Sequence, residues 1–368
     1  MISPKNKRNL LKIIPFGIIS SISSFLYSLI EKGILGDSSI YPSTGNPYVF
    51  DPITAAIFSL ILGLFIGIFE VLLLSKWFRK SSLLKKILLK TAIYILLLTV
   101  FILLLSIIDH ALEMKLSPLD KRVLDYSAIF LTSFAFWTVI IYASAGIGIC
   151  LFYTEISDNI GQGVLLNFFT GKYHRPKEEK RIFMFIDMKS STTIAEKLGH
   201  VQYFNMLKEY YADLSDPIVQ YGGEIYQYVG DEIVISWKYG KAFNNNDVLH
   251  CFFAMKTSLL GESKKYESKF GVIPTFKAGA HLGKVTTGEI GVIKKEIIFS
   301  GDVLNTTARI QGLCNNYKVD FLVSQKLIRS INLGQEFRSQ ALGETELRGR
   351  NKKISLYTIK KTEHIKPT

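Results

Sequence analysis

Residues 181–192 read RIFMFIDMKSST, and this order of residue types is the clearest structural signal in the chain. The run from 181 to 186 is apolar and contains no Gly or Pro, which predicts a buried strand. Asp187 ends that strand, and a helical apolar pattern follows until Gly199. A carboxylate beside a helix N-terminus combines a metal ligand with backbone N–H groups for phosphate, although Asp is also a common helix cap.

A second carboxylate lies in EIYQYVGDEIVISW, residues 224–237. Two β-rich runs flank Gly230 and Asp231, which predicts a hairpin with Asp231 at its tip. An isolated Asp at a hairpin tip is most often a turn residue. Asp187 and Asp231 together, however, place carboxylates at two strand ends of one domain, and such a pair indicates a two-metal site that holds a triphosphate.

Two further elements carry side chains suited to phosphate chemistry. In GDVLNTTARIQ, residues 301–311, Asn305 and Arg309 are four apart and project from one face of a predicted helix. Asn can orient a ribose or phosphate oxygen and Arg can stabilise charge on a phosphoryl group, although a solvated helix face is the alternative. Arg348 and Arg350 lie at a basic tip that can either reach a triphosphate or stay solvated.

These elements, in this order, resemble the class III adenylate and guanylate cyclases. The resemblance covers about residues 181–360 and rests on FIDMKSST at 185–192, YVGDEIVISW at 228–237, GDVLNTTARIQ at 301–311 and LRGR at 347–350. It implies an α/β ferredoxin-like catalytic domain that works as a head-to-tail homodimer. It also implies a phosphorus–oxygen lyase of the adenylate cyclase type, which converts ATP to 3′,5′-cyclic AMP and pyrophosphate.

The resemblance also implies how the metals and the phosphates are held. Asp187 and Asp231 would bind two Mg²⁺ or Mn²⁺ ions per active site, helped by the backbone carbonyl of Ile186. The phosphates would lie on the backbone N–H groups of one continuous stretch, formed by Met188, Lys189, Ser190, Ser191 and Thr192.

The second subunit would contribute Asn305 to orient the ribose, Arg309 to stabilise the transition state, and Arg350 to bind phosphate where the family often has Lys. The family commonly reads adenine with a Lys and with an Asp or Thr at positions that here hold Gln227 and Ile298. A Gln amide can read either purine and Ile offers no hydrogen bond, so a guanylate cyclase, or one acting on another base, is the alternative.

The sequence offers two alternatives to a nucleotide cyclase of this family. The stretch GGEI at 222–225 is similar to part of the diguanylate cyclase signature, but the predicted hairpin tip falls at Asp231 instead. A membrane receptor with a degenerate cyclase-like dimerisation module would typically have lost a metal-binding Asp or the Arg. This chain retains Asp187, Asp231, Asn305 and Arg309, which favours an enzyme.

The N-terminal half is predominantly apolar. Four stretches, at about 13–30, 52–75, 91–108 and 127–153, are each close to or above the roughly 18 residues that cross a bilayer as a helix. We therefore expect a four-helix α-helical transmembrane domain at 1–153 and an amphipathic helical linker at 154–180. The catalytic domain would occupy 181–361 and a C-terminal tail 362–368.

Basic residues before the first stretch and between the second and third predict which side faces the cytosol. The chain would be a multi-pass protein of the cell (inner) membrane, with its N-terminus and catalytic domain cytosolic. Glu70 lies inside the second stretch and is a functional-site candidate by default, although snorkelling or an interhelical hydrogen bond is the alternative. Since the external connections are short, a stimulus would act through the spans, the lipid or an unidentified membrane regulator.

The formal net charge is +13, many of the basic residues lie beside apolar stretches, and no nucleic-acid recognition motif accompanies them. We therefore expect the lipid bilayer, the ATP substrate and a second copy of the chain as partners, and no nucleic acid. Cys150, Cys251 and Cys314 are too few and too scattered for a disulfide framework or a zinc site, which predicts buried free thiols.

Overall fold

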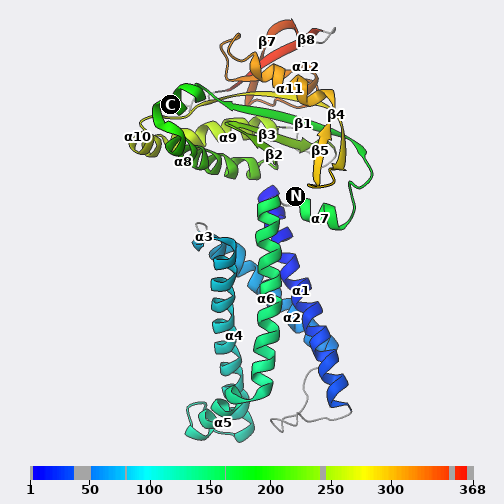
Figure 1. The fold of residues 1–368 in the computed structure, drawn as a ribbon, viewed down its shortest axis with the longest axis vertical. Coiled ribbons are helices and arrows are strands. Elements are labelled where there is room, and N and C mark those ends of the chain that lie inside the picture. Colours follow the sequence, from blue (N-terminus) through cyan, green and yellow to red (C-terminus); the bar gives the residue numbers. More distant parts are fainter. Residues whose placement is uncertain are drawn as a thin grey trace. The chain divides into compact units, whose positions relative to one another are not determined.

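The computed structural model describes residues 3–36, 51–78, 81–161, 163–240, 246–347 and 353–362. The chain divides into two compact units (Figure 1). One unit, Asn6–Gln162, is helical, and the other joins Met1–Lys5 to Gly163–Thr368 and contains the sheet. We refer to them as the helical unit and the sheet unit.

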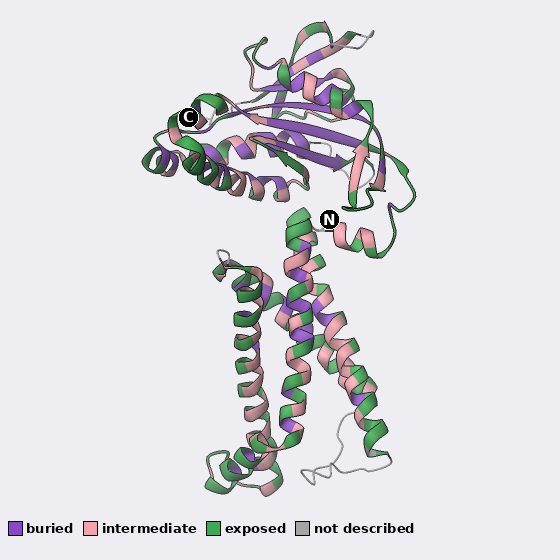
Figure 2. Ribbon diagram, in the orientation of Figure 1, coloured by how far each residue is buried: buried purple, intermediate pink, exposed green. Residues whose placement is uncertain are grey.

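The helical unit consists of α1 (Pro4–Leu35), α2 (Pro52–Phe69), the π-helical turn η1 (Glu70–Leu74), α3 (Ser75–Trp77), α4 (Leu83–Met114), α5 (Lys121–Thr132) and α6 (Phe134–Ile160). Among the described residues, four helices are long and apolar enough to cross a membrane: Pro4–Ile34, Pro52–Leu74, Leu83–Met114 and Phe134–Ile160. The unit itself buries few of their side chains, as the pink and green ribbons of Figure 2 show. The prediction of four apolar helices is confirmed, and lipid is the environment that would cover such faces.

The start of the fourth apolar helix differs from the prediction, which placed it at 127. Ser133 has extended backbone geometry (φ −69°, ψ 149°), and its Oγ accepts a hydrogen bond from the Phe136 N–H at 3.2 Å. Ser133 therefore caps α6, and residues 127–132 belong to the separate helix α5. A capping Ser ends one helix and starts another without interrupting an apolar run, so hydropathy alone misses it.

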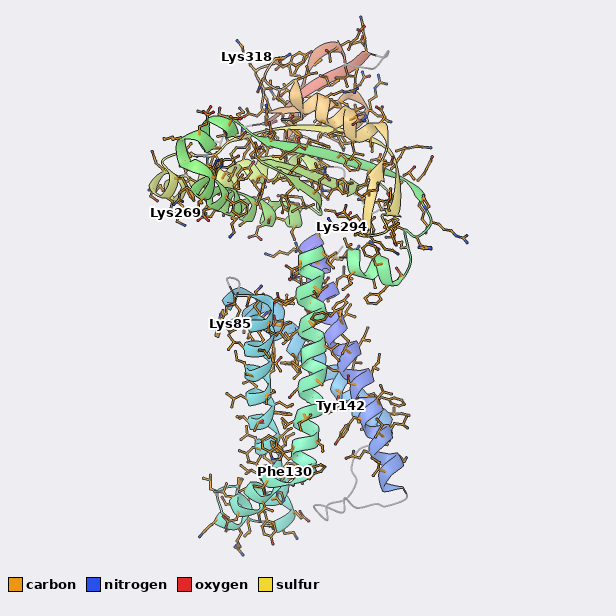
Figure 3. All side chains as sticks on the ribbon, viewed as in Figure 1. Lys85, Phe130, Tyr142, Lys269, Lys294 and Lys318 are labelled. Carbon is orange, nitrogen blue, oxygen red and sulfur yellow. The ribbon has the colours of Figure 1, made fainter. Side chains whose placement is uncertain are left out.

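Contacts between aromatic and polar side chains hold α6 to α1. The ring centroids of Tyr27 and Tyr142 lie 4.9 Å apart, and Tyr142 is labelled in Figure 3. The Tyr27 hydroxyl also lies 3.1 Å from Thr138 Oγ1. Both interactions belong to the helical unit.

Glu70, the ionisable residue inside the second apolar stretch, is the first residue of the π-helical turn η1. Its Oε1 lies 2.5 Å from Lys90 Nζ, and its Oε2 accepts a hydrogen bond from the Tyr94 hydroxyl at 2.9 Å. Lys90 also lies 3.0 Å from Glu155 of α6, and the side chains of Glu70 and Lys90 are each 2% exposed. The interhelical contact is therefore the correct alternative for Glu70, and snorkelling is excluded.

The sheet unit contains helices α7 (Val164–Phe169), α8 (Ser191–Gln220), α9 (Asp247–Gly261), α10 (Ser263–Phe270), α11 (Asp302–Gly312) and α12 (Gln325–Ile328). Its strands are β1 (Lys177–Met188), β2 (Glu224–Val229), β3 (Glu232–Lys238), β4 (Phe276–Ile290), β5 (Glu296–Ser300), β6 (Phe321–Ser324), β7 (Phe337–Glu346) and β8 (Lys353–Lys361). The strand order is β2-β3-β1-β4-β6-β8-β7, with β5 paired to β4. β4 and β6 are parallel whereas β1 is antiparallel to both β3 and β4, so the predicted α/β class is confirmed with a mixed sheet.

The two faces of β1 bury alternate side chains in different clusters. Ile182, Met184 and Ile186 join the large core that α8 and α9 cover. Phe183 and Phe185 join a smaller cluster on the opposite face, together with residues of α11. This alternation follows from the two-residue repeat of a strand, and it makes β1 the centre of the unit.

Two predicted details of the unit differ from the structure. Helix α8 does not stop at Gly199: the backbone there is non-helical (φ 73°, ψ 163°), but the helix resumes and continues to Gln220. Within the expected linker at 154–180, α6 runs to Ile160, α7 covers only Val164–Phe169, and β1 already begins at Lys177. The kink at Gly199 has a positive φ, which glycine adopts without strain. For the same reason, a glycine in a helical pattern predicts a helix end.

The three cysteines are free and buried, as predicted from their number and spacing: Cys150, Cys251 and Cys314.

Candidate active site

Asp187 and Asp231 lie side by side at one end of the sheet. Asp187 is the second-last residue of β1, and Asp231 sits in the turn between β2 and β3, which confirms the predicted hairpin. Because Ile186 pairs with Ile233 across the antiparallel strands, the two carboxylates leave adjacent strand ends. Burial raises the pKa of Asp231, the negative charge of Asp187 raises it further, and a hydrogen bond from Ser191 opposes the rise.

The donor set around these carboxylates fits a divalent cation. The buried Asp231 Oδ2 has no hydrogen-bond partner among the residues that the structure describes. Two side by side carboxylates with an unsatisfied oxygen attract a hard cation. The described residues contain no group of three or more His, Cys, Asp and Glu side chains suited to a metal. A Mg²⁺ ion held by one or two carboxylates plus substrate phosphates and water needs no such group.

Two residues that the sequence analysis did not single out contact Asp187. Lys277 Nζ lies 3.2 Å from Asp187 Oδ2, and Gln311 Nε2 donates a hydrogen bond to the same oxygen at 3.1 Å. Lys277 lies opposite Asp187 in the register of β1 and β4, and Gln311 is on α11. A strand pairing between positions 90 residues apart leaves no local sequence signal, although Gln311 does end the quoted motif at 301–311.

The stretch after β1 was expected to cradle phosphates. The Lys189 N–H instead donates to the Thr275 carbonyl at 2.8 Å, and the Lys189 side chain forms an ion pair with Asp320. Ser190 adopts left-handed geometry (φ 55°) and precedes the first turn of α8. Because the first N–H groups of a helix have no partner within it, the turn that begins at Ser191 is the part of this stretch suited to an anion.

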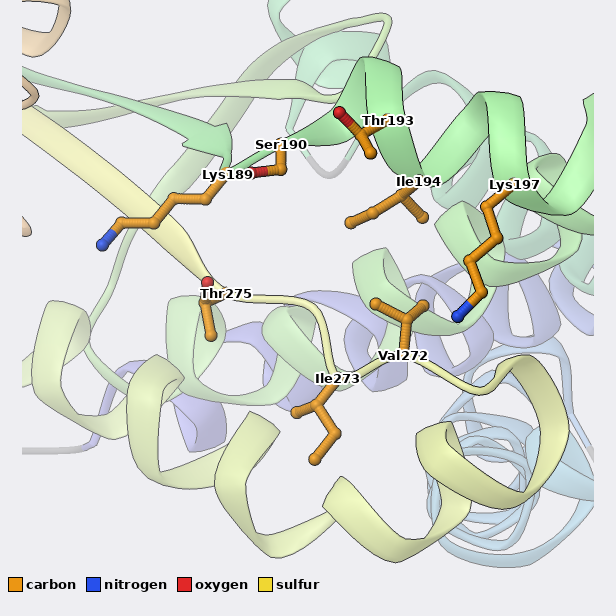
Figure 4. Close-up of a pocket in the computed structure, with 8 residues that line it drawn as sticks. All are labelled: Lys189, Ser190, Thr193, Ile194, Lys197, Val272, Ile273 and Thr275. Atoms are coloured by element: carbon orange, nitrogen blue, oxygen red, sulfur yellow. The ribbon is translucent and has the colours of Figure 1, made fainter.

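A cavity of about 400 Å³ lies beside this turn (Figure 4). Its lining residues come from the start of α8 and from the segment before β4: Lys189, Ser190, Thr193, Ile194, Lys197, Val272, Ile273 and Thr275. Neither Asp187 nor Asp231 lines it. The geometry of the carboxylate pair, rather than this cavity, therefore defines the candidate site.

The remaining predicted site residues lie on other elements. Asn305 is exposed and Arg309 is half-buried on α11. Within the described part of the chain, neither forms a hydrogen bond or ion pair with the carboxylate pair. Arg350 and its neighbour Arg348 lie outside the described residues.

The two expected base-selecting residues lie on strands that meet. Gln227 is exposed on β2, and Ile298 is half-buried on β5. The rings of their neighbours Tyr226 and Phe299 are in contact in a tilted arrangement, with centroids 4.8 Å apart, and the Phe299 N–H donates to the Tyr226 hydroxyl at 3.4 Å. β2 and β5 are thus brought together although neither pairs with the other in the sheet.

Residues 174–361 match the family model described as the adenylate and guanylate cyclase catalytic domain. The chain is 34% identical over 221 residues to adenylate cyclase 2 of Rhizobium meliloti (strain 1021), covering 60% of this chain and 61% of that protein. It is 25% identical over 183 residues to an adenylate cyclase of Anabaena cylindrica, covering 48% and 36%. The chain therefore spans less than two thirds of these relatives.

Among solved structures, the chain is similar to the adenylyl cyclase CyaB from P. aeruginosa, with 16% identity and a TM-score of 0.46 over 52% of this chain and 98% of that one. A bacterial light-regulated adenylyl cyclase matches with 18% identity and a TM-score of 0.49, over 56% and 60%.

Proposed function

This chain belongs to the adenylate and guanylate cyclase catalytic domain family, and from that membership we propose that it is a membrane-bound adenylate cyclase. It would convert ATP to 3′,5′-cyclic AMP and pyrophosphate. The observation that carries the proposal is the adjacent pair Asp187 and Asp231, because a buried Asp231 oxygen has no hydrogen-bond partner among the described residues and Ser191, which begins α8, lies beside it. This arrangement suits a metal–triphosphate complex.

Asp187 and Asp231, with the carbonyl of Ile186, would hold two Mg²⁺ or Mn²⁺ ions. When bound, the ions supply a lowered pKa at the ribose 3′-hydroxyl and neutralise charge on the departing pyrophosphate. The first turn of α8 would bind phosphate oxygens through its N–H groups. Lys277, whose ammonium group already balances Asp187, would add a positive charge at the same place.

In this proposal Asn305 would orient the ribose, Arg309 would stabilise the transition state, and Arg350 would bind phosphate. Among the residues that the structure describes, no hydrogen bond or ion pair joins Asn305 or Arg309 to the carboxylate pair of the same chain. We therefore propose that a second copy supplies them, so that each active site forms across a homodimer interface. The Arg309 guanidinium would stabilise the charge that develops on the phosphoryl oxygens.

The basic test is a product assay with purified full-length protein. With Mn²⁺ or Mg²⁺ and each nucleoside triphosphate in turn, we expect cyclic AMP from ATP, and no product from the Asp187→Ala variant. Linear dinucleotide products, or unchanged activity in Asp187→Ala, would contradict the proposal. No cyclic nucleotide from any triphosphate would favour the degenerate receptor instead.

Mixing two inactive variants tests the shared site. Asp231→Ala and Arg309→Ala each disable one half of a site, so a heterodimer retains one intact site. Equal mixing should restore about one quarter of wild-type activity, because half of the dimers are mixed and each has one of two sites. Preparations of each variant alone are the control, and a demonstrated heterodimer without activity would contradict the arrangement.

A guanylate cyclase is the second candidate, because Gln227 can hydrogen-bond either purine and Ile298 cannot hydrogen-bond at all. The same product assay separates the two candidates through the ratio of kcat/KM for ATP and GTP.

We also propose that residues 1–153 anchor the protein in the cell (inner) membrane, with the catalytic region 181–361 in the cytosol. Four apolar helices and the basic residues near Lys12 and Lys86 support this orientation. Labelling of single Cys residues placed near each helix end, from one side of sealed vesicles, measures it directly. Labelling of the catalytic region only from outside right-side-out vesicles would contradict it.

A further inference from the structure

The strands that carry Gln227 and Ile298 are joined by side chains rather than by a backbone ladder. β2 pairs with β3 and β5 pairs with β4, so β3, β1 and β4 separate them in the sheet. The ring of Phe299 nevertheless packs on Tyr226 and also on Phe183 of β1, at 4.8 Å and 5.4 Å between centroids. β5 therefore lies against the face of the sheet that Phe183 forms, and side-chain contacts set its distance from β2.

Arg181 lies at the centre of this contact. It is 4% exposed, and its guanidinium carbon lies 4.5 Å from the centroid of the Phe299 ring. Its Nη1 lies 2.7 Å from Glu224 Oε2 at the start of β2 and donates to Ser236 Oγ of β3 at 2.9 Å. One buried side chain on β1 thus contacts β2, β3 and β5.

Glu179 holds the other edge of the guanidinium. Its Oε2 lies 3.0 Å from Arg181 Nε, and its Oε1 accepts hydrogen bonds from Lys238 Nζ at 3.0 Å and from the Tyr173 hydroxyl at 3.1 Å. With its own side chain only 7% exposed, Glu179 is a fixed partner. Arg is suited to this place because a planar fork can form ion pairs along its edges while it stacks on an aromatic ring, and a Lys ammonium group cannot do both.

We infer that Arg181 is a positioning residue for base recognition: it sets the separation between the strand that carries Gln227 and the strand that carries Ile298. The inference rests on the proposed function. Among the partners of Arg181, Glu224 lies on the same strand as Gln227, three residues before it, and Phe299 follows Ile298 directly on β5. Loss of the guanidinium frees β5 to shift against β2, and discrimination between bases is sensitive to such a shift.

The test compares Arg181→Lys with a matched surface variant, Lys284→Met. Lys284 of β4 forms an ion pair with Glu178 of β1, the residue before Glu179, but the two side chains are 71% and 69% exposed. For Arg181→Lys, we expect KM for the preferred nucleotide to rise about tenfold, with kcat within about twofold. The ratio of kcat/KM for the preferred nucleotide to that for the other purine nucleotide should fall about tenfold. Lys284→Met should leave all three values unchanged.

A second variant guards against a folding defect at Arg181. Phe299→Leu keeps an apolar contact and all the ion pairs but removes the stacking surface, so it should lower the base ratio in the same direction. The two effects should not add in the double variant, because both act on one contact. Melting temperatures are measured in parallel. A lower melting temperature with an unchanged base ratio would show that Arg181 is only structural, and would overturn the inference.

Binding of non-cyclisable ATP and GTP analogues separates this inference from the proposed function. If the wild-type protein forms no cyclic nucleotide, the proposed function fails. The ratio of analogue Kd values in Arg181→Lys then still reports base recognition: a ratio nearer to one supports the inference, and an unchanged ratio overturns it.

Discussion

Gly279 of β4 lies directly beneath α11, the helix that carries Asn305 and Arg309. A Cβ at position 279 would lie 2.4 Å from the backbone N of Gln311 and 2.7 Å from its Cα. Both atoms are backbone, so no side-chain rotation relieves the clash. An ordinary contact needs about 3.4 Å, and Gly279→Ala therefore displaces α11 by about 1 Å.

The displacement of α11 should lower the rate of the reaction more than it lowers the stability of the fold. A misplacement of about 1 Å in a positioned group costs on the order of 100-fold in rate, whereas overpacking of a core costs about 1–3 kcal/mol of unfolding free energy. For Gly279→Ala we expect kcat for cyclic AMP formation to fall on the order of 100-fold. The assay is steady-state product formation at saturating Mn²⁺ and ATP, with the melting temperature measured on the same preparation.

The matched control is Gly312→Ala, at the last residue of α11, the helix that Gly279→Ala would displace. Apart from its chain neighbours and the nearby backbone of its own helix, a Cβ at position 312 would meet no atom within 4 Å, so activity and stability should change little. Wild-type kcat in Gly279→Ala would show that the position of α11 against β4 does not control the reaction, and the assignment of Asn305 and Arg309 would lose its support.

Three further outcomes are expected. Gln311→Leu removes the hydrogen bond to Asp187, so the Mn²⁺ dissociation constant measured by calorimetry should rise about tenfold; an unchanged constant would separate Gln311 from the metal site. Burial alone would raise the pKa of Glu179, but Lys238 and Arg181 lower it to about 2, so its stabilisation is present above pH about 4.5 and lost as the pH falls toward 2. The melting temperature of the wild type should therefore fall more steeply from pH 5 to 3 than that of Glu179→Gln, and parallel curves would count against the ion pairs. In the helical unit, Lys90→Met leaves a buried carboxylate at Glu70 and should cost about 3–5 kcal/mol of unfolding free energy in detergent, most of it regained in Lys90→Met with Glu70→Gln; equal loss in both would contradict a buried pair.

The elements that carry the site were predictable because each has a local pattern. The apolar run ending at Asp187, the two β-rich runs around Asp231 and the four-residue spacing of Asn305 and Arg309 all lie within one strand, hairpin or helix. The four apolar helices were visible for the same reason, since a span buries its backbone hydrogen bonds within its own segment. Their ends were less predictable, as Ser133 shows: a cap depends on one backbone conformation that hydropathy does not record.

Contacts between distant segments could not be read in this way. Lys277 and Gln311 reach Asp187 through the register of β1 with β4 and the packing of α11, and Lys90 reaches Glu70 from another helix. The sequence predicts Arg181 only as the first residue of a strand. In the folded protein, β5 packs so that the Phe299 ring contacts the Arg181 guanidinium. Periodicity reports which face of an element is buried but not which element covers it, because packing partners are chosen by shape and charge across the whole unit. The sequence therefore predicted the residue types suited to the chemistry. Only the tertiary structure identified the neighbouring residues that position them.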